Sequence, residues 1–273
     1  MKKVAFILDR YKYDIYKLIL DRILKDNNNN KNIDLERINF EPENIDEYFL
    51  KYKYLLFDHN IQDNNNFFYF NNKFNGIDLK EKSFRKLIKH FELDLNNKQV
   101  LIIENSNFFK SIYSTLNEFD DIKIKIVTYD TNKLYNLKKG DYYVNNLEVS
   151  RLNSIYCVIN TSQIGNNYEL NPLNLDINYE LAIETLINPV DTSFLKKSRL
   201  NNSKIINGIY LAIFEIISFL EIYDESIKIN STHINELYIY IMNILEPSID
   251  EYIDKVDTSG DFIKLLKGVK YDE

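Results

Sequence analysis

Residues 187–219 read INPVDTSFLKKSRLNNSKIINGIYLAIFEIISF, and they indicate a turn followed by a long apolar helix. The turn contains Asn188-Pro189, and Asn207-Gly208 precedes a run whose apolar residues fall on nearly every face of a helix. A helix that is apolar all round is normally buried inside a protein. We therefore expect a buried helix over about 206–222, and a position between two domains would bury it.

Upstream of this stretch, short β-rich runs alternate with helical patterns. Helical spacing of apolar residues predicts helices at about 15–24, 45–51, 84–91 and 108–119. Strands are expected at 4–8, 33–40, 54–57, 99–103, 122–127, 155–159 and 183–187, with a hairpin around Asn71-Asn72. Strands separated by helices form βαβ units, so the sequence predicts an α/β fold with two α/β domains. The second should be a Rossmann-like doubly wound parallel sheet, followed by C-terminal helices.

Size and charge exclude several classes of protein. The 273 residues are enough for one large or two ordinary domains. The net charge is −7, and no run of Lys or Arg is long enough to follow a phosphate backbone, so nucleic acid is not an expected partner. No apolar run reaches 18 residues, and Asp9 and Arg10 interrupt the short one near the N-terminus. We expect no membrane association and a cytoplasmic location, with the single cysteine, Cys157, as a buried hydrophobic residue.

The turn and helix of residues 187–219 resemble the C-terminal half of the shikimate dehydrogenase family. That family carries a D-x-x-Y-N-P-x-x-T-x-L-L turn before an N-G-x-x-M-L-x-x-Q helix. This chain has Glu184, Ile187 and Glu215 at the positions of the Asp, the Tyr and the Gln. The resemblance implies an NAD(P)-dependent oxidoreductase of aromatic amino acid biosynthesis. It also implies a trimmed N-terminal substrate domain at 1–82, a Rossmann-like domain at 83–205, and a helical region at 206–273 that packs back on the N-terminal domain.

The loop that should bind the dinucleotide has no glycines. Where the family has G-x-G-G-A-A after the first strand of the Rossmann domain, this chain reads Glu104-Asn105-Ser106-Asn107-Phe108-Phe109. Glycines there allow backbone N–H groups to approach the pyrophosphate. Asn105, Ser106 and Asn107 are the candidate ligands by position, although an acidic Glu104 and a bulky Phe108 oppose phosphate binding. The alternative is that one of the three polar residues only caps the following helix.

Two further segments bear on the cofactor. Asp130 and Thr131 follow the next strand, where an Asp can accept from a ribose 2′-hydroxyl and would repel a 2′-phosphate, so NAD is favoured over NADP if a dinucleotide binds. The alternative is that Asp130 caps a helix. The run INTSQIG at 159–165 resembles the family's I-N-A-T-P-x-G loop beside the nicotinamide, which makes Asn160 and Thr161 candidates, together with Gly208.

The substrate positions of the family are also altered. An ungapped match puts Asp14 and Tyr16 at its two serines, and the segment that carries its acid–base lysine looks deleted. Lys80 stands at the position of the catalytic aspartate, or Asp78 in a register shifted by two residues. Asp14 and Glu215 would repel a substrate carboxylate in a low-dielectric cleft.

The reciprocal change of charge suggests that Lys80 and Glu215 form an ion pair across the domain junction, the alternative being two separately solvated side chains.

Other chemistry is sparse in this sequence. His59, His90 and His233 are scattered without the spacing of metal ligands, so no metal is expected. His59 follows Asp58 at a strand end that faces the crevice of an α/β sheet, but a surface histidine is the simpler expectation.

Two functions stay open for this chain. One is a shikimate dehydrogenase-like oxidoreductase whose activity has diverged or been lost. The other is a non-catalytic descendant that binds a small molecule or a protein partner. A helical pattern near 237–245 could also support a homo-oligomer through the C-terminal helices.

Overall fold

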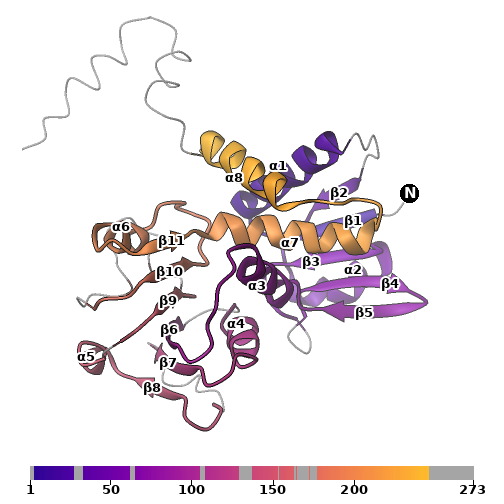
Figure 1. Cartoon of the computed structure of the whole chain (residues 1–273). Helices are drawn as coiled ribbons and strands as arrows, with labels where there is room; N and C mark the ends of the chain where they lie inside the picture. Colours follow the sequence, from indigo (N-terminus) through magenta and orange to yellow (C-terminus); the bar gives the residue numbers. More distant parts are fainter. Residues whose placement is uncertain are drawn as a thin grey trace, which may run out of the picture.

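The computed structural model describes residues 3–27, 33–61, 65–104, 108–128, 137–152, 154–162, 164, 172 and 177–245. Within these residues the chain forms two sheets, one of five strands in the order β2-β1-β3-β4-β5 and one of six in the order β11-β10-β9-β6-β7-β8 (Figure 1). The two sheets lie in separate halves of the molecule, and helices occupy the space between them. The predicted α/β fold with two α/β domains is confirmed.

The first sheet is built from the N-terminal part of the chain. Its parallel strands are β1 (Lys3–Ile7), β2 (Asp34–Arg37) and β3 (Tyr54–Phe57), and the hairpin β4 (Phe67–Asn71) and β5 (Lys73–Ile77) extends it in antiparallel fashion. The connecting helices are α1 (Arg10–Asp26), the 3-10 turn η1 (Pro42–Asn44) and α2 (Ile45–Lys51). Asn72 turns the hairpin with φ at 60°, a left-handed conformation that asparagine tolerates better than most residues. The hairpin predicted around Asn71-Asn72 is therefore confirmed.

The second sheet is entirely parallel within the described residues. Its strands are β6 (Gln99–Glu104), β7 (Lys123–Thr128), β8 (Tyr142–Val144), β9 (Cys157–Asn160), β10 (Leu181–Glu184) and β11 (Lys204–Ile206). The helices that follow some of these strands are α4 (Phe108–Leu116), α5 (Asn146–Val149) and α6 (Ser193–Leu200). The strand order reverses between β6 and β9, which makes the sheet doubly wound. Cys157 is buried in β9, as expected.

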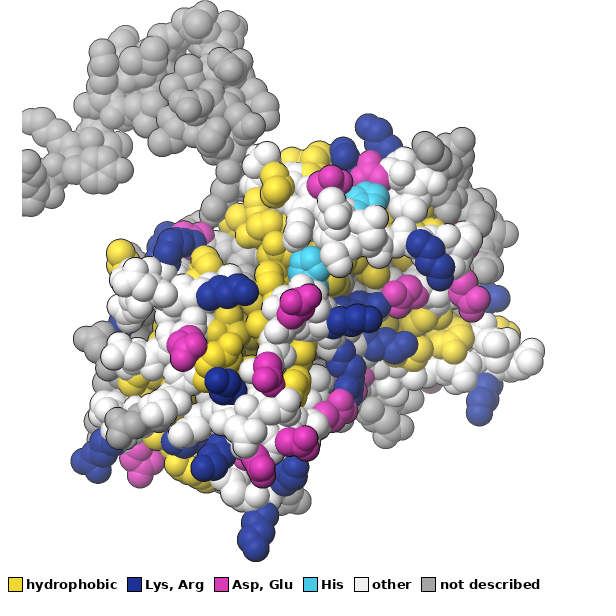
Figure 2. All heavy atoms as spheres, in the orientation of Figure 1, with side chains coloured by type: hydrophobic (Ala, Val, Ile, Leu, Met, Phe, Trp, Pro, Cys, Tyr) yellow, Lys and Arg dark blue, Asp and Glu magenta, His cyan; other side chains and the backbone are white. Residues whose placement is uncertain are grey.

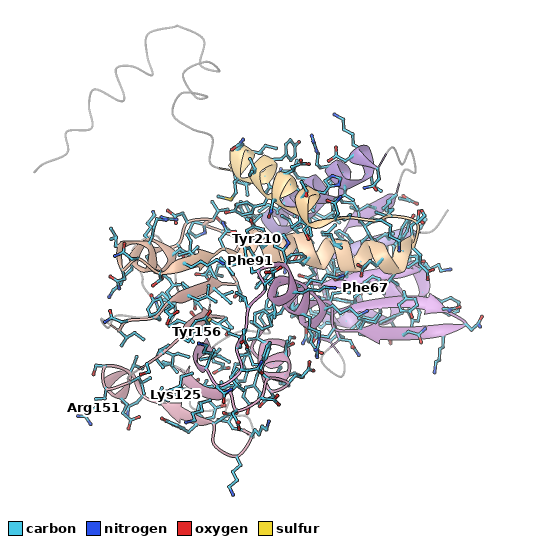
Figure 3. All side chains as sticks on the ribbon, in the orientation of Figure 1. Phe67, Phe91, Lys125, Arg151, Tyr156 and Tyr210 are labelled. Atoms are coloured by element: carbon cyan, nitrogen blue, oxygen red, sulfur yellow. The ribbon has the colours of Figure 1, made fainter. Side chains whose placement is uncertain are left out.

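Helix α7 (Gly208–Tyr223) crosses the molecule between the two sheets, with α3 (Leu79–His90) and α8 (Ser231–Leu245) beside it (Figure 1). Twelve of its sixteen residues are buried, so the prediction of a buried helix is confirmed. Figure 3 shows Phe91, at the end of α3, close to Tyr210 of α7, with ring centroids 4.8 Å apart. Aromatic contacts of this kind join α3 and α7 into one layer.

Several element boundaries differ from those predicted. Ile206 belongs to β11 rather than to the long helix, because Asn207 caps α7 by accepting from the backbone N–H of Ile209. The strand expected at 183–187 ends at Glu184, and the residues after it form a loop. The helix expected from 84 begins at Leu79, where the side chain of Asp78 accepts from the backbone N–H of Glu81. Helices α5 and α6 and strands β8 and β11 were not predicted.

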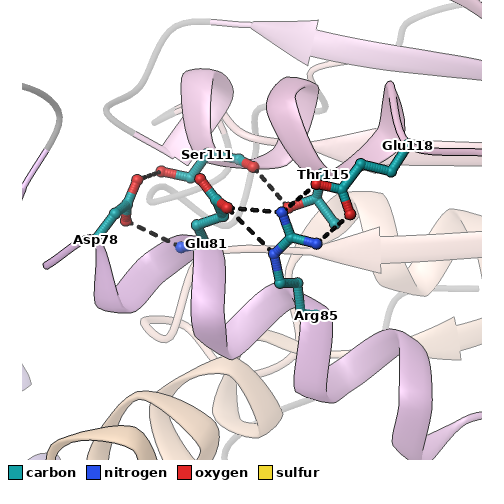
Figure 4. Close-up of polar contacts among 6 residues, drawn as sticks. All are labelled: Asp78, Glu81, Arg85, Ser111, Thr115 and Glu118. Atoms are coloured by element: carbon teal, nitrogen blue, oxygen red, sulfur yellow. Dashed lines mark hydrogen bonds and ion pairs between the residues drawn. The ribbon is translucent and has the colours of Figure 1, made fainter.

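A polar network, which we call the α3–α4 clamp, ties α3 to α4 (Figure 4). Asp78 accepts from the hydroxyl of Ser111 at 2.6 Å, and Arg85 binds both Glu81, at 2.7 Å, and Glu118. Exposed ion pairs of this kind contribute only about 0–1 kcal/mol each. The clamp therefore fixes the orientation of α3 more than it adds stability.

The remaining observations on the fold concern surface charge, membrane-spanning helices and metal ligands. Charged side chains of both signs are interspersed on the face shown in Figure 2. Among the described residues, no helix combines the length and apolarity that crossing a membrane requires. The same part of the chain contains no group of three His, Cys, Asp or Glu side chains arranged to hold a metal ion.

Candidate functional site

A cavity of about 430 Å³ lies between the two halves of the molecule. Its walls come from α1 and the end of β3 on one side, from the loop after β10 on the other, and from the start of α3, α4 and α7. Ligand pockets commonly have volumes of about 300–1,000 Å³. Its ionisable residues are Asp9, Tyr11, Lys12, Tyr16, Asp58, Lys80 and Glu215.

The carboxyl ends of β1 and β3 open into the cavity and bring Asp58 next to α1. The ammonium of Lys12 donates to Oδ1 of Asp58 at 2.7 Å. Burial opposes the charge of Lys12, but Asp58, Tyr16 and Glu215 together outweigh it and hold the pKa of Lys12 well above its usual value. The Lys12 charge in turn lowers the pKa of Asp58 to about 2. The two residues form a stable ion pair at neutral pH.

Lys80 is a buried cation in the first turn of α3, with 2% of its surface exposed. Its Nζ donates to the backbone carbonyl of Asp58 and lies 5.2 Å from the centre of the Phe108 ring. Burial lowers the pKa of Lys80 to about 8, and the charge of Lys12 acts in the same direction. An amine with a pKa this close to neutral can both give and take a proton.

Glu215 faces the cavity from the middle of α7 and is held by two donors. The hydroxyl of Tyr16 donates to Oε2 at 2.5 Å, and Nδ2 of Asn66 donates to Oε1 at 2.6 Å. Burial and the nearby Glu215 carboxylate raise the pKa of Tyr16 well above its usual value. Tyr16 therefore keeps its proton and acts as a donor.

Glu184 anchors the loop after β10, which forms one wall of the cavity. Its carboxylate accepts from Nδ2 of Asn160 at 3.0 Å, from the hydroxyl of Thr192 at 2.9 Å, and from the backbone N–H groups of Thr185 and Leu186 at 2.9 and 3.1 Å. Burial raises the pKa of Glu184 to about 7, although these hydrogen bonds act to lower it. We call this set of contacts the Glu184 anchor.

Gly208 lets the start of α7 lie directly against the same loop. A Cβ atom built at Gly208 would come within 2.1 Å of the backbone carbonyl oxygen of Leu186. A carbonyl that belongs to an anchored loop cannot easily move aside. Glycine is therefore required by the close approach of two backbones.

Replacing Gly208 by alanine should lower the free energy of unfolding by about 1–3 kcal/mol, the usual cost of overpacking. Urea denaturation measures the change. Leu200→Ala is the control, because Leu200 lies on the surface with 83% of its area exposed. Equal stability of the Gly208 variant and the wild type would mean that α7 does not approach the loop this closely.

Four of the residues predicted from the sequence line the cavity, namely Tyr16, Lys80, Glu215 and Gly208. Asp14 does not, and its placement at a pocket position is wrong. Its side chain is 64% exposed and lies 3.9 Å from Arg10. Lys12 and Tyr16, four residues apart on α1, share the helix face that meets the cavity, whereas Asp14 points away. Asp78 caps α3 and does not line the cavity.

The predicted ion pair between Lys80 and Glu215 is also wrong. Both side chains face the same cavity, but Lys80 binds the carbonyl of Asp58, and Glu215 binds Tyr16 and Asn66. A buried polar group must form hydrogen bonds with the partners nearest to it. For Lys80 and Glu215 these partners are other residues rather than each other.

Apart from Gly208, which lines the cavity, the candidate cofactor residues are either buried away from it or outside the described residues. Asn160 and Thr161 are fully buried; Asn160 serves the Glu184 anchor, and Thr161 donates to the carbonyl of Ile103 at 2.8 Å. Neither lines the cavity. The remaining candidates, Asn105, Ser106, Asn107, Asp130 and Thr131, lie outside the described residues.

Sequence reasoning missed Lys12 and Asn66. Lys12 could have been predicted, because it lies four residues before Tyr16 and therefore on the same face of the helix. No feature of the sequence indicated Asn66. His59, expected at the surface, is partly buried with its ring 4.5 Å from that of Phe40, and burial lowers its pKa. It does not line the cavity.

Comparison with known proteins shows which proteins this chain resembles in sequence and fold. No protein-family model matches the chain. Over 170 residues it is 21% identical to the shikimate dehydrogenase (NADP(+)) of Clostridium perfringens strain ATCC 13124, and the match covers 60% of this chain and 62% of the relative. A relative from strain 13 of the same species is 22% identical over the same length. The match thus spans less than two thirds of the length of these curated relatives.

Solved structures match over a larger share of the chain. A chorismate mutase/shikimate 5-dehydrogenase fusion protein from Clostridium acetobutylicum has a TM-score of 0.72 and 16% identity, with 90% of this chain and 100% of that chain covered. Shikimate dehydrogenase 1 from Peptoclostridium difficile has a TM-score of 0.72 and 14% identity, with 90% and 99% covered. Shikimate 5-dehydrogenase from Thermus thermophilus, in complex with NADP(H) and shikimate, has a TM-score of 0.72 and 12% identity, with 88% and 100% covered.

Proposed function

We propose that this chain, which has the shikimate dehydrogenase-like oxidoreductase fold and resembles shikimate dehydrogenases in sequence, binds a small polar molecule in its cavity and has diverged from, or lost, the oxidation of shikimate. The observation that carries the proposal is that Lys80 and Glu215 line the same cavity between the two sheets. An ammonium group and a carboxylate that line the same cavity provide the few fixed polar groups that orient a ligand in a pocket.

Lys80 is the residue best suited to chemistry at the ligand. With a pKa of about 8 it can donate a hydrogen bond to a carbonyl or hydroxyl oxygen and exchange a proton with it. The ion pair of Lys12 and Asp58 holds the Asp58 backbone that Lys80 contacts. Lys80 is the proposed acid–base group, and Lys12 and Asp58 are positioning residues.

The described residues at the expected dinucleotide site do not fit a diphosphate. Glu104 ends β6 with 2% of its surface exposed, and Phe108 begins α4 and lines the cavity. A buried carboxylate repels a phosphate group, and a large ring occupies space at the helix start where backbone N–H groups would contact it. When bound to an oxidoreductase, a nicotinamide dinucleotide accepts or donates a hydride. We assign no step to such a cofactor in this protein.

A second candidate function is an NAD-dependent oxidoreductase with a changed substrate. Its support is the fold together with Lys80, whose acid–base character suits the interconversion of an alcohol and a ketone. The preference for NAD over NADP rests on Asp130. A protein partner and a homo-oligomer formed through the C-terminal helices stay predictions.

A titration with NADH and NADPH separates the two functions. We expect neither nucleotide to raise the melting temperature, because Glu104 and Phe108 oppose diphosphate binding. A ligand at 100 times its dissociation constant would stabilise the fold by about 2.7 kcal/mol, which shifts melting by several degrees.

The matched control for this titration is a variant with Glu104→Gln and Phe108→Gly, in which the charge and the ring are both removed. If this variant binds NADH weakly and the wild type does not, the result supports Glu104 and Phe108 as the residues that prevent dinucleotide binding. Clear stabilisation of the wild type by NADH would contradict the proposed loss of dinucleotide binding. It would favour the second candidate function, an NAD-dependent oxidoreductase.

A further inference from the structure

Glu215 presents an acceptor to the cavity, and its neighbours fix it in that role. The backbone N–H of Leu79 donates to Oδ1 of Asn66 at 2.8 Å, so the amide group of Asn66 must turn Nδ2 toward Glu215. The hydroxyl of Tyr16 donates to the other oxygen of Glu215. Because both partners donate, the Glu215 carboxyl group accepts on both oxygens, as an ionised carboxylate does.

The Glu215 carboxylate retains acceptor capacity for a ligand. An ionised carboxylate has about four lone-pair sites, and the hydrogen bonds from Tyr16 and Asn66 use two of them. The side chain is 1% exposed and yet lines the cavity. A ligand group that reaches Glu215 must therefore donate a hydrogen bond, since an acceptor there would face another acceptor away from water.

Lys80, at the start of α3, supplies donors to the same cavity. The ammonium of Lys80 carries three N–H groups, one of which goes to the carbonyl of Asp58. Lys12 already neutralises the Asp58 carboxylate. Among the lining residues, the carboxylates of Asp9, Asp58 and Glu215 outnumber the two ammonium groups. The cavity therefore does not favour a ligand with a negative charge.

We propose that the cavity selects a small polyhydroxylated molecule that carries no acidic group. One of its hydroxyls donates to Glu215, and another hydroxyl or a carbonyl oxygen accepts from Lys80. Hydroxyl groups suit both Glu215 and Lys80 because each hydroxyl can donate and accept. A carboxylate beside Glu215 would be repelled strongly in a cavity of low dielectric constant. This inference rests on the proposed function as a binding protein and specifies its ligand.

Shikimate and its methyl ester form a matched pair of probes, because they share the hydroxylated ring and differ in the negative charge. We expect calorimetry near pH 7 to show the ester bound to the wild type at least about tenfold more tightly than the acid, a difference of about 1.4 kcal/mol. In Glu215→Gln the repelling charge is gone, so the preference should fall about tenfold. Thermal melting checks that this variant is folded.

The control variant is Glu221→Gln, the same change on the same helix at a residue that binds Lys86 outside the cavity. It should keep the preference of the wild type. Myo-inositol and D-fructose serve as further probes of the uncharged class.

Three outcomes would overturn the inference. They are equal or tighter binding of shikimate by the wild type, an unchanged preference in Glu215→Gln, and no binding of any uncharged probe. The measurement needs no dinucleotide, so its failure is distinct from the result of the NADH titration.

Discussion

Replacing Glu184 by alanine should lower the free energy of unfolding by about 3–5 kcal/mol. The substitution removes the acceptor shared by Asn160, Thr192 and two backbone N–H groups, all of them buried or nearly so. Each buried donor left without an acceptor costs about 1–3 kcal/mol, partly offset by water that enters the space. Denaturant unfolding monitored by circular dichroism measures the loss.

Two controls sharpen this experiment. Glu180→Ala removes an exposed glutamate just before the same strand and should change stability by less than about 0.5 kcal/mol. Glu184→Gln keeps one acceptor oxygen and should be less damaging than alanine. A loss below about 1 kcal/mol for Glu184→Ala would show that the loop does not depend on the Glu184 anchor.

The raised pKa of Glu184 also gives this anchor a pH dependence. Between the ordinary value of 4.5 and about 7, the folded state binds more protons at Glu184 than the unfolded state does. Stability must then fall as the pH rises through that window. Relative to Glu184→Gln, which does not titrate, the wild type should lose stability from pH 4.5 to 7.

Replacing Lys80 by methionine should weaken the binding of methyl shikimate by about 10- to 100-fold. The ligand would lose a hydrogen bond to a charged donor, which contributes about 1.5–3 kcal/mol. Methionine keeps the apolar bulk of the lysine stem, so the fold should remain intact. Lys82→Met is the control, because Lys82 is exposed on the same helix. Unchanged affinity in Lys80→Met would remove Lys80 from the site.

The pKa of Lys80 can be measured without a ligand. Lysines labelled by reductive ¹³C-methylation should include one NMR resonance that titrates near pH 8 and is absent from Lys80→Met. From pH 8 to 10.5 the unfolded state binds more protons at Lys80 than the folded state, so wild-type stability should rise relative to the variant. A resonance that titrates only near 10.5 would contradict the burial of this ammonium.

The sequence was sufficient to predict the fold because burial leaves a local signal. Strand β3 is a continuous apolar run and β6 contains one, and a helix with apolar residues on all faces is expected to be buried. Helix α6 and strand β11 escaped prediction because residues 193–206 are rich in Lys, Ser and Asn and show no clear period. Their position depends on packing against β10, which is a tertiary effect.

The site was predicted only in part, since its contacts join residues far apart in the chain. Tyr16 and Glu215 are 199 residues apart, and Asn66 is 149 residues from Glu215. Matching Asp14 to a family serine failed because the phase of α1, set by its cap at Asp9, turns Lys12 inward instead. Glu184 was recognised as a family position, but its partner Asn160, 24 residues away, could not be inferred from spacing.

The passage of α7 between the two sheets has a consequence for the evolution of the chain. One apolar cluster contains Phe6 of β1, Ile102 of β6 and Phe219 of α7, so the two halves share part of their hydrophobic core. Separating the two halves would expose the apolar sides of α7 to water and leave each fragment without part of its hydrophobic core. The two halves therefore depend on each other for folding, whereas residues that face the cavity between them can be replaced without removing this shared core.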